Sequence, residues 1–221
     1  MEFEVFDIGL TEYRRARRFQ QEIFSGVKSG RLGSALILCR HYPVVTLGRL
    51  TGKGSLKVPY GELARNGIQA YEVERGGGVT YHGPGQLIVY PICNLEYFKK
   101  DLHWYLRALE EAVMGCLAVF GIEAQRRQEL TGVWIGNKKI SSIGIAISRW
   151  VTFHGLSLNI KKDDLHTFSL IRPCGMDIEM TSIETVLQES VDADMVKQTF
   201  VQNFRDVFLA EEEKAPILAR R

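Results

Sequence analysis

The chain has 221 residues, of which 45% are hydrophobic and 24% charged, and its 28 basic and 26 acidic side chains give a net charge of +2. This composition is typical of a soluble globular protein, and the balanced charge argues against a dedicated nucleic-acid surface. The start of the chain resembles neither a signal nor a transit peptide, and no apolar run is long enough to span a membrane. We therefore expect a cytoplasmic protein without a membrane or nucleic-acid partner.

The first half of the chain alternates between strand-like and helical patterns. Thr11 is a residue type that caps helices, so we expect it to begin a helix that runs to about Val27 and is closed by Gly30. A short helix is expected over residues 61–66, before Gly67. Short apolar runs predict strands at residues 5–8, 35–39, 44–47, 69–73, 79–81 and 87–93.

The second half contains the clearest helix, which begins near Asp101 and ends at Gly121. Its predicted core face carries Leu102, Leu106, Leu109, Val113, Leu117 and Phe120. Strands are expected at 132–135, 139–147 and 151–158, and helices at 182–187 and 194–208. The order of elements predicts an α+β fold with a mixed, largely antiparallel sheet flanked by helices, over a single domain at residues 1–210. The charged residues 211–221 are expected to form a disordered tail.

The run Arg75-Gly-Gly-Gly-Val-Thr-Tyr-His82 is the strongest indication of a ligand site. Its three consecutive glycines can adopt positive φ and let a ligand approach backbone N–H groups, at an entropic cost that structural loops seldom accept. Arg75 and His82 bracket the glycines with charge and hydrogen-bonding capacity. A hairpin turn with a bulge would explain one or two of the glycines, but it does not require the continuation to Gln86.

Cys174 differs from the other three cysteines because it lies between Pro173 and Gly175, in a segment without strand or helix periodicity. Such a turn can expose a nucleophilic thiol, and the positive charge of Arg172 would favour the thiolate. A buried thiol that packs as a small hydrophobe is the alternative. Cys39, Cys93 and Cys116 lie on apolar patterns and are expected to be core residues.

A cysteine nucleophile needs a basic partner, and three side chains are candidates: His82, His154 and Lys139. Spacing alone would make a strand lysine such as Lys139 a solvated edge residue. His82, His154 and His166 lack a local pair at metal-ligand spacing, and the glycine run fits no phosphate-binding motif. Acyl transfer through Cys174 is therefore the chemistry that the residues favour.

Four blocks together resemble the octanoyltransferases of lipoate biosynthesis, the lipoate-protein ligase B family. The first is His41-Tyr-Pro-Val-Val-Thr-Leu-Gly-Arg49 and the second is residues 75–92. The third joins Gly132-Val-Trp134 with Lys139-Ile-Ser-Ser-Ile-Gly144 and Phe153-His-Gly-Leu-Ser-Leu-Asn159, and the fourth is Arg172-Pro-Cys-Gly175. The second and fourth blocks are specific in combination. The resemblance implies a catalytic domain with the fold of biotin and lipoate protein ligases, around a hydrophobic acyl tunnel.

The resemblance also implies the reaction. Octanoyl would pass from acyl carrier protein to Cys174, and then to a lysine on lipoyl domains of 2-oxoacid dehydrogenases and the glycine cleavage H protein, without ATP or a metal. Lys139 matches the family lysine that lowers the thiol pKa and carries protons. The positions that match substrate-binding segments are Arg75, Gly76, Gly77, Gly78, Val79, Thr80, Tyr81, His82, Ser142, Ile143, Gly144, Gly155, Leu156 and Ser157.

Two other functions compete with this interpretation. An ATP-dependent lipoate ligase would use the glycine run for an acyl-adenylate and would not need Cys174. A binding module with a vestigial site would hold an octanoyl carrier protein without discharging its thioester. Arginines at positions 14, 15, 17 and 18, or at 126 and 127, are candidates for docking an acidic carrier protein, although a solvated helix face explains the first group equally well. We expect a monomer.

Overall fold

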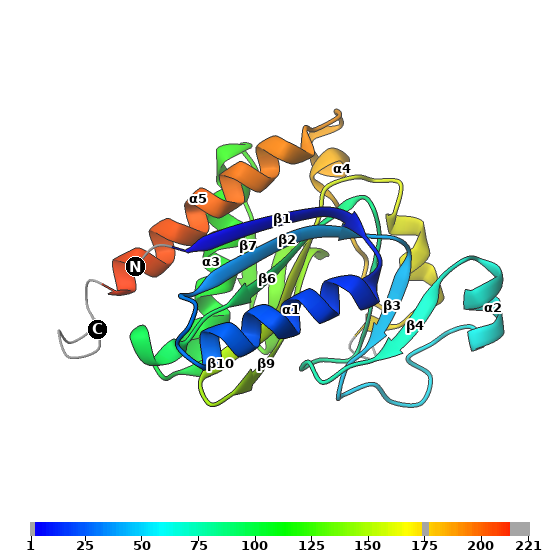
Figure 1. Cartoon of the computed structure of the whole chain (residues 1–221). Helices are drawn as coiled ribbons and strands as arrows, with labels where there is room; N and C mark the ends of the chain where they lie inside the picture. Colours follow the sequence, from blue (N-terminus) through cyan, green and yellow to red (C-terminus); the bar gives the residue numbers. More distant parts are fainter. Residues whose placement is uncertain (1–2, 174–176, 213–221) are drawn as a thin grey trace.

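The computed structural model describes residues 3–173 and 177–212, and a mixed β-sheet with helices on both faces dominates it (Figure 1). Over these residues the main sheet has seven strands in the order β1-β2-β6-β10-β9-β8-β7. β1 and β2 pair in parallel, and the other neighbours pair antiparallel. The strands are β1 Glu4–Thr11, β2 Ala35–His41, β6 Gln86–Ile92, β7 Gln125–Arg127, β8 Leu130–Ile135, β9 Lys138–Ser148 and β10 Val151–Asn159. The predicted α+β class with a largely antiparallel sheet is confirmed.

The central strands are apolar on both faces because helices cover both. In β2, Leu36 and Leu38 join the core beneath helices α3 (Leu102–Val119) and α5 (Ala193–Glu212), whereas Ile37 joins the core beneath α1 (Tyr13–Lys28). This alternation follows from the two-residue period of a strand. The three cysteines expected in the core are all buried.

A smaller sheet lies beside the main one and carries part of the predicted glycine-run block. Its order is β4-β3-β5, with β4 at Gln69–Glu72, β3 at Val44–Leu47 and β5 at Val79–His82. Helix α2 (Tyr60–Arg65) and the 3₁₀ segment η2 (Leu165–Leu170) accompany this sheet. The chain between β4 and β5 contacts strand β9 of the main sheet, where the N–H of Gly76 donates to the carbonyl of Ile145 at 2.8 Å.

Helix boundaries agree with the expected patterns to within a residue or two, except at the start of α1 and at the end of α5. Asp101 caps α3 by accepting from the N–H of Trp104 at 3.1 Å, and Ser182 caps α4 (Ile183–Leu187) in the same way. The expectation that Thr11 caps α1 was wrong: Thr11 is the last residue of β1, and Glu12 occupies the capping position. The strand keeps Thr11 because its backbone pairs with His41 of β2.

Three short elements were not expected from sequence: β7, η2 and the 3₁₀ turn η1 (Leu95–Tyr97). Helix α5 continues to Glu212, two residues into the predicted tail, and residues 213–221 lie outside the described part. None of the helices between residues 3 and 212 that the structure describes is long and apolar enough to cross a membrane.

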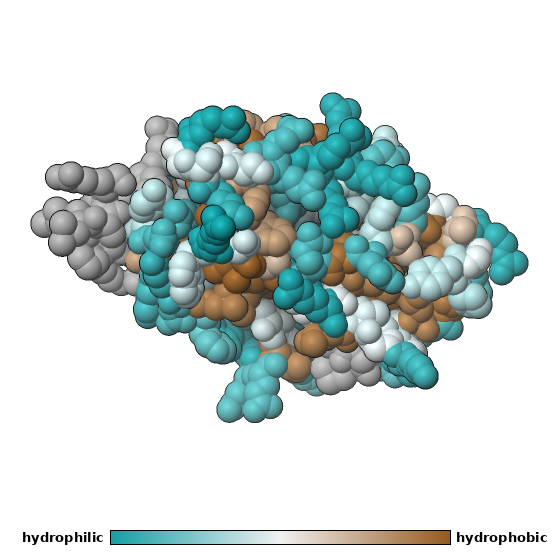
Figure 2. Space-filling view, turned by 60° about the horizontal axis from the view of Figure 1, so that its bottom comes forward, coloured by the Kyte–Doolittle hydropathy of each residue, from teal (hydrophilic) through white to brown (hydrophobic). Residues whose placement is uncertain are grey.

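Hydrophobic side chains on the face shown in Figure 2 gather in patches that hydrophilic ones separate. Two exposed apolar side chains have a place in the site described below, Leu50 at 78% exposure and Leu102 at 39%.

Candidate active site

A cavity of about 470 Å³ brings together nearly all the side chains predicted to bind substrate. The glycine run after β4, strands β9 and β10, and the start of α3 form its walls. The predicted residues that line it are Arg75, Gly76, Gly77, Gly78, Val79, Thr80, His82, Lys139, Ser142, Ile143, Gly144, Gly155, Leu156 and Ser157. Leu50 and Leu102 also line it, and because both are exposed they mark its opening to solvent.

Tyr81 is the predicted binding residue whose side chain the structure places elsewhere. It alternates with Thr80 and His82 along β5, so its ring points to the opposite face and stacks edge-on against Phe168, with 5.6 Å between ring centroids. Tyr81 is buried in the core of the smaller sheet. Its contribution to the site is therefore to support β5.

The glycine run is fixed in place by backbone contacts on both sides. Gly76 bonds to β9, and the N–H of Leu50 donates to the carbonyl of Gly77 at 3.0 Å. Gly77 has a φ of +79°, which only glycine adopts without strain. A Cβ at Gly144 on β9 would lie 2.8 Å from the carbonyl oxygen of Gly76. The glycines thus allow two backbones to approach closely at the cavity wall.

Arg75 is buried, with only 8% exposure, and its guanidinium forms hydrogen bonds with Thr46 of β3. Its Nη2 donates to the carbonyl and to the hydroxyl of Thr46, both at 2.8 Å. These charge-assisted bonds hold the positive charge at the cavity wall.

Three buried histidines at this wall are held neutral: His82 and His154 line the cavity, and His41 lies beside His82. Burial lowers the pKa of His82 well below its usual range, and nearby His41 and Arg75 add to the effect. Burial also lowers the pKa of His154 to about 4, although Glu74 opposes the shift. Among the described residues, His82 Nδ1 and Thr80 Oγ1 have no hydrogen-bond partner. Buried polar atoms of this kind are available to a ligand.

His41 gives the protein a testable pH dependence. Its Nδ1 lies 3.1 Å from the Thr11 carbonyl and its Nε2 lies 2.7 Å from the Tyr90 hydroxyl, which fixes the neutral Nδ1-protonated form. Burial lowers the pKa of His41 to about 4, so the folded state stays neutral while the unfolded state takes up a proton below about pH 6.5. The contribution of His41 to the free energy of unfolding is fully present above about pH 6.5, and the free energy of unfolding falls by about 3 kcal/mol as the pH drops toward 4.

Urea unfolding of wild type and His41→Asn between pH 7.5 and 4.5 measures this contribution. The free energy of unfolding should fall with pH more steeply in the wild type than in the variant. Equal slopes for the two proteins would contradict the assignment.

Lys139 lies near the start of β9 and is only 4% exposed, whereas spacing alone favoured a solvated edge residue. Its Nζ donates to the carbonyl of Thr131 at 2.8 Å and lies 5.2 Å from the centre of the Trp134 ring. Its backbone bonds on one side to Glu179 and Thr181, which follow the predicted cysteine block. The structure thus places the ammonium group at the cavity wall.

Cys174, the predicted nucleophile, lies outside the described residues. The residues on either side of the gap are described, and Pro173 and Ile178 both line the same cavity as Lys139. The N–H of Arg172 donates to the carbonyl of Ser55 at 2.7 Å, and Met180 pairs with Lys139.

One wall of the cavity is apolar, as an acyl chain requires. Ile143, Ile145 and Leu156 contribute from β9 and β10, and Leu102 and Leu106 face them from α3. The sequence pattern assigned both leucines to the core face of α3. Leu106 is partly buried and packs against the core as expected, whereas Leu102 at the start of the helix is exposed, so its assignment to the core was wrong. Within the described residues no group of three metal-ligating side chains is found.

Comparison with known proteins identifies the family. The model of the lipoyl protein ligase A/B catalytic domain matches residues 12–205. An octanoyltransferase from Thermoanaerobacter sp. (strain X514) is 41% identical over 207 residues, covering 93% of this chain and 90% of the relative. One from Clostridium kluyveri is 39% identical and covers 96% and 92%. The chain belongs to the octanoyltransferases of the lipoyl protein ligase A/B family. The predicted resemblance is confirmed, and the protein is an acyltransferase.

The fold of this octanoyltransferase-family chain is shared with ligases. A crystal structure of lipoate-protein ligase A bound with ATP superposes with a TM-score of 0.80 at 18% identity, covering 100% of this chain and 93% of the ligase. Biotin protein ligase from Aquifex aeolicus superposes with a TM-score of 0.58 at 11% identity, covering 97% and 73%. At these identities the likeness shows the fold alone.

Several cavity residues of this octanoyltransferase-family chain were missed from sequence, because they come from separate segments. Tyr13 of α1, Thr46 of β3 and Tyr90 of β6 line the cavity. Thr46 and Tyr90 lie within the family blocks but were not singled out there, and Tyr13 lies outside them. Glu110 of α3 is also missed, although a charged residue next to the apolar stripe of a helix is a signal that could have found it.

Proposed function

We propose that the protein transfers octanoyl from acyl carrier protein to Cys174 as a thioester, and then to the ε-amino group of a lysine on lipoyl domains. The acceptors are lipoyl domains of 2-oxoacid dehydrogenases and the glycine cleavage H protein, and the enzyme acts in the cytoplasm as a monomer, without ATP or a metal. The observation that carries the proposal is the buried ammonium group of Lys139 in a cavity also lined by the residues that flank Cys174.

In the first step, the Cys174 thiolate attacks the carbonyl carbon of the carrier-protein thioester. The tetrahedral intermediate collapses, the bond to the carrier sulfur breaks, and the Lys139 ammonium gives a proton to the departing thiolate. The products are octanoyl-Cys174, a free carrier thiol and a neutral Lys139 amine. An ammonium beside the cysteine favours the thiolate before attack, so one lysine serves both purposes.

In the second step, the acceptor amine attacks the octanoyl-Cys174 carbonyl, and neutral Lys139 accepts its proton. Collapse expels the Cys174 thiolate and leaves an amide, which restores the thiolate and ammonium of the resting enzyme. Two covalent half-reactions conserve the thioester energy, which is why ATP is not required. The Gly76 N–H already bonds to β9, so an oxyanion donor from the glycine run would be Gly77 or Gly78.

The exposed basic face of α1 is suited to an acidic carrier protein. Arg14, Arg17 and Arg18 line a surface groove with Tyr13, and Tyr13 also lines the cavity, so the groove adjoins the site. Arg17 already pairs with Glu74 at 2.9 Å, which leaves Arg14 and Arg18 as the exposed charges of the groove.

The double variant Arg14→Glu/Arg18→Glu should raise KM for octanoyl carrier protein by about tenfold at low salt, with kcat unchanged, because steering by charge is lost. Steady-state kinetics at low and high salt measures the effect, with Arg65→Glu on α2 as the matched control. An unchanged KM would remove this groove from the docking surface.

The reaction is tested by incubating the enzyme with octanoyl carrier protein and a lipoyl domain, with and without ATP, and following the intact mass of the lipoyl domain by mass spectrometry. Gain of one octanoyl group at equal rates in both samples is expected. If the lipoyl domain is modified only when ATP and free octanoate are supplied, the protein is a ligase. Lipoate-protein ligase A, which was crystallised with ATP, has the same fold. Carrier binding without transfer would favour a binding module.

A further inference from the structure

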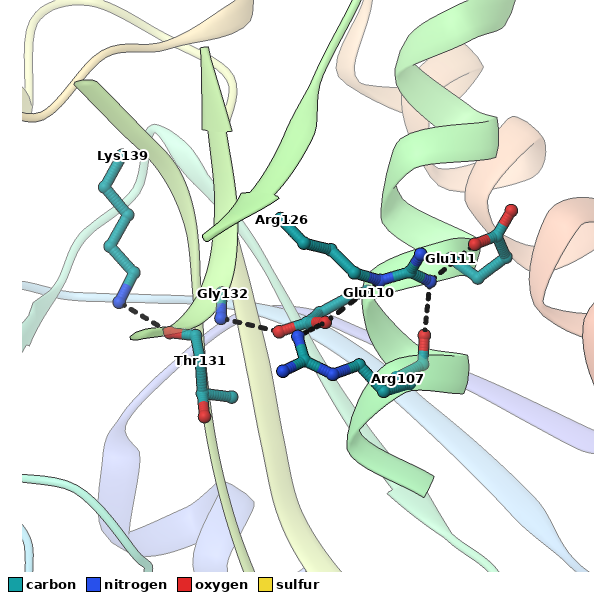
Figure 3. A network of polar contacts seen from close by, with 7 residues as sticks. All are labelled: Arg107, Glu110, Glu111, Arg126, Thr131, Gly132 and Lys139. Carbon is teal, nitrogen blue, oxygen red and sulfur yellow. Dashed lines mark hydrogen bonds and ion pairs between the residues drawn. The ribbon is translucent and has the colours of Figure 1, made fainter. Parts of the chain in front are cut away.

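Glu110 is a carboxylate without exposure to solvent, on the face of α3 that meets β8 (Figure 3). Its Oε2 accepts from Arg107 at 2.6 Å and from Arg126 at 3.2 Å. Its Oε1 accepts from the backbone N–H of Gly132 at 3.0 Å. A buried carboxylate is costly unless paired, and here both oxygens are used.

The bond to Gly132 connects Glu110 to the proposed catalytic lysine through one peptide unit. The N–H of Gly132 and the carbonyl of Thr131 belong to the same peptide group, and they point in opposite directions as in any trans peptide. The N–H meets the carboxylate of Glu110, and the carbonyl accepts from Lys139 Nζ at 2.8 Å (Figure 3). The peptide dipole therefore lies between a negative and a positive charge, in the direction that both charges favour.

The backbone at Gly132 leaves space for the side chain of Lys139. Gly132 has a φ of +128°, and a Cβ built on it would lie 2.5 Å from Cε of Lys139. The register between β8 and β9 shifts at the next residue pair, with Val133 opposite Ser141 but Trp134 opposite Lys139. An irregularity of this kind re-aims a side chain at the edge of a site.

We propose that Glu110 is a positioning residue for acyl transfer: its carboxylate holds the Thr131–Gly132 peptide so that the Thr131 carbonyl receives the Lys139 ammonium at the cavity wall. The proposal rests on the proposed role of Lys139. Glu110 acts through the peptide and touches neither substrate nor the reacting atoms. Loss of its charge weakens the carbonyl as an acceptor, loosens the ammonium group and raises the fraction of neutral thiol at Cys174.

Other charged groups lie around Lys139 and are the same in all the variants compared below. Arg127 of β7 stacks on the Trp134 ring that Lys139 contacts, and Glu129 and Arg75 line the same cavity. Lys138 on the same strand forms an ion pair with Glu179 of the neighbouring segment. These groups are common to the variants below, so differences between variants report Glu110.

The test compares Glu110→Gln with Glu111→Gln. Glu111 lies on the same helix and pairs with the same Arg126, but its described bond runs to Arg126 and not to Gly132. The first readout is kcat/KM with octanoyl carrier protein. We expect it to fall by about tenfold or more in Glu110→Gln, as is typical when a residue that orients a functional group is removed. We expect it to stay unchanged in Glu111→Gln.

The second readout is the pH dependence of Cys174 alkylation by iodoacetamide, which a purely structural role would not move. The other cysteines are buried, and burial raises the pKa of Cys93 and Cys116 to about 12, so alkylation reports Cys174. We expect the alkylation midpoint of Glu110→Gln to rise by about one pH unit. A midpoint equal to that of the wild type, or loss of activity equal in both glutamine variants, would overturn the proposal.

Two further variants keep the result interpretable. If Glu110→Gln does not fold, Gly132→Ala moves the same peptide from the other side, and its alkylation midpoint should rise; an unchanged midpoint would overturn the proposal. Lys139→Ala distinguishes the proposed role of Lys139 from that of Glu110. If it leaves the midpoint unchanged, the proposed role of Lys139 fails and the Glu110 proposal fails with it. If it raises the midpoint while Glu110→Gln does not, the Glu110 proposal alone fails.

Discussion

Replacing Cys174 by serine should reduce octanoyl transfer by at least about 10⁴-fold, because removing the nucleophile of a covalent mechanism removes the main route. A serine hydroxyl is far less acidic than a thiol, so the positive charge of Lys139 does not generate a comparable nucleophile. Turnover is measured with octanoyl carrier protein and a lipoyl domain, following the mass of the lipoyl domain.

The matched control for Cys174→Ser is Cys116→Ser. Cys116 is buried against the carbonyl of Val196 in the α3–α5 core and is not among the residues that line the cavity, so its loss should change stability without abolishing transfer. Wild-type activity in the Cys174→Ser enzyme would refute the requirement for a thioester at Cys174. Activity lost equally in both variants would point to damaged folding.

Replacing Lys139 by alanine should reduce kcat by about 10²- to 10⁴-fold, the range that a positioned acid and base contributes. The charge that favours thiolate and the group that accepts the acceptor proton would both be lost. Its Nζ touches Thr131 and the Trp134 ring, and Lys139→Met keeps the apolar stem against that ring, so this second variant separates packing from proton transfer.

Both lysine variants should melt within a few degrees of the wild type while losing activity. Single-turnover measurements with octanoyl carrier protein show which half-reaction slows. Full activity in Lys139→Met would assign the proton transfers to another group, and His154, which also lines the cavity, would then be examined.

Most of the fold could be predicted from the sequence because its apolar patterns are regular. The buried strands β2 and β6 form continuous apolar runs bounded by turns, and α3 has a clear stripe with a capping Asp101. Thr11 shows the limit of local rules: its type suits a helix cap, but pairing with β2 keeps it in β1. The short β7 has three residues and too little pattern to detect.

The site could be predicted only where its residues form motifs. The glycine run and the blocks around Lys139 and Ser157 lie together at the cavity, whereas Tyr81 faces the opposite side of β5, as alternation along the strand would have indicated. The burial of Lys139 was not predictable from spacing, because it depends on Trp134 and Thr131 of the neighbouring strand. The charge of Glu110 beside the apolar stripe of α3 is visible in the sequence, but its bond to the backbone N–H of Gly132 is not, because that contact depends on the packing of α3 against β8.

The thioester mechanism is decided by the intact mass of the enzyme after mixing with octanoyl carrier protein, without ATP and without a lipoyl domain. We expect one added octanoyl group per enzyme, which neutral hydroxylamine removes and which is absent from Cys174→Ser. An enzyme of unchanged mass alongside fully charged carrier protein would contradict the thioester mechanism, as would an adduct that persists in Cys174→Ser.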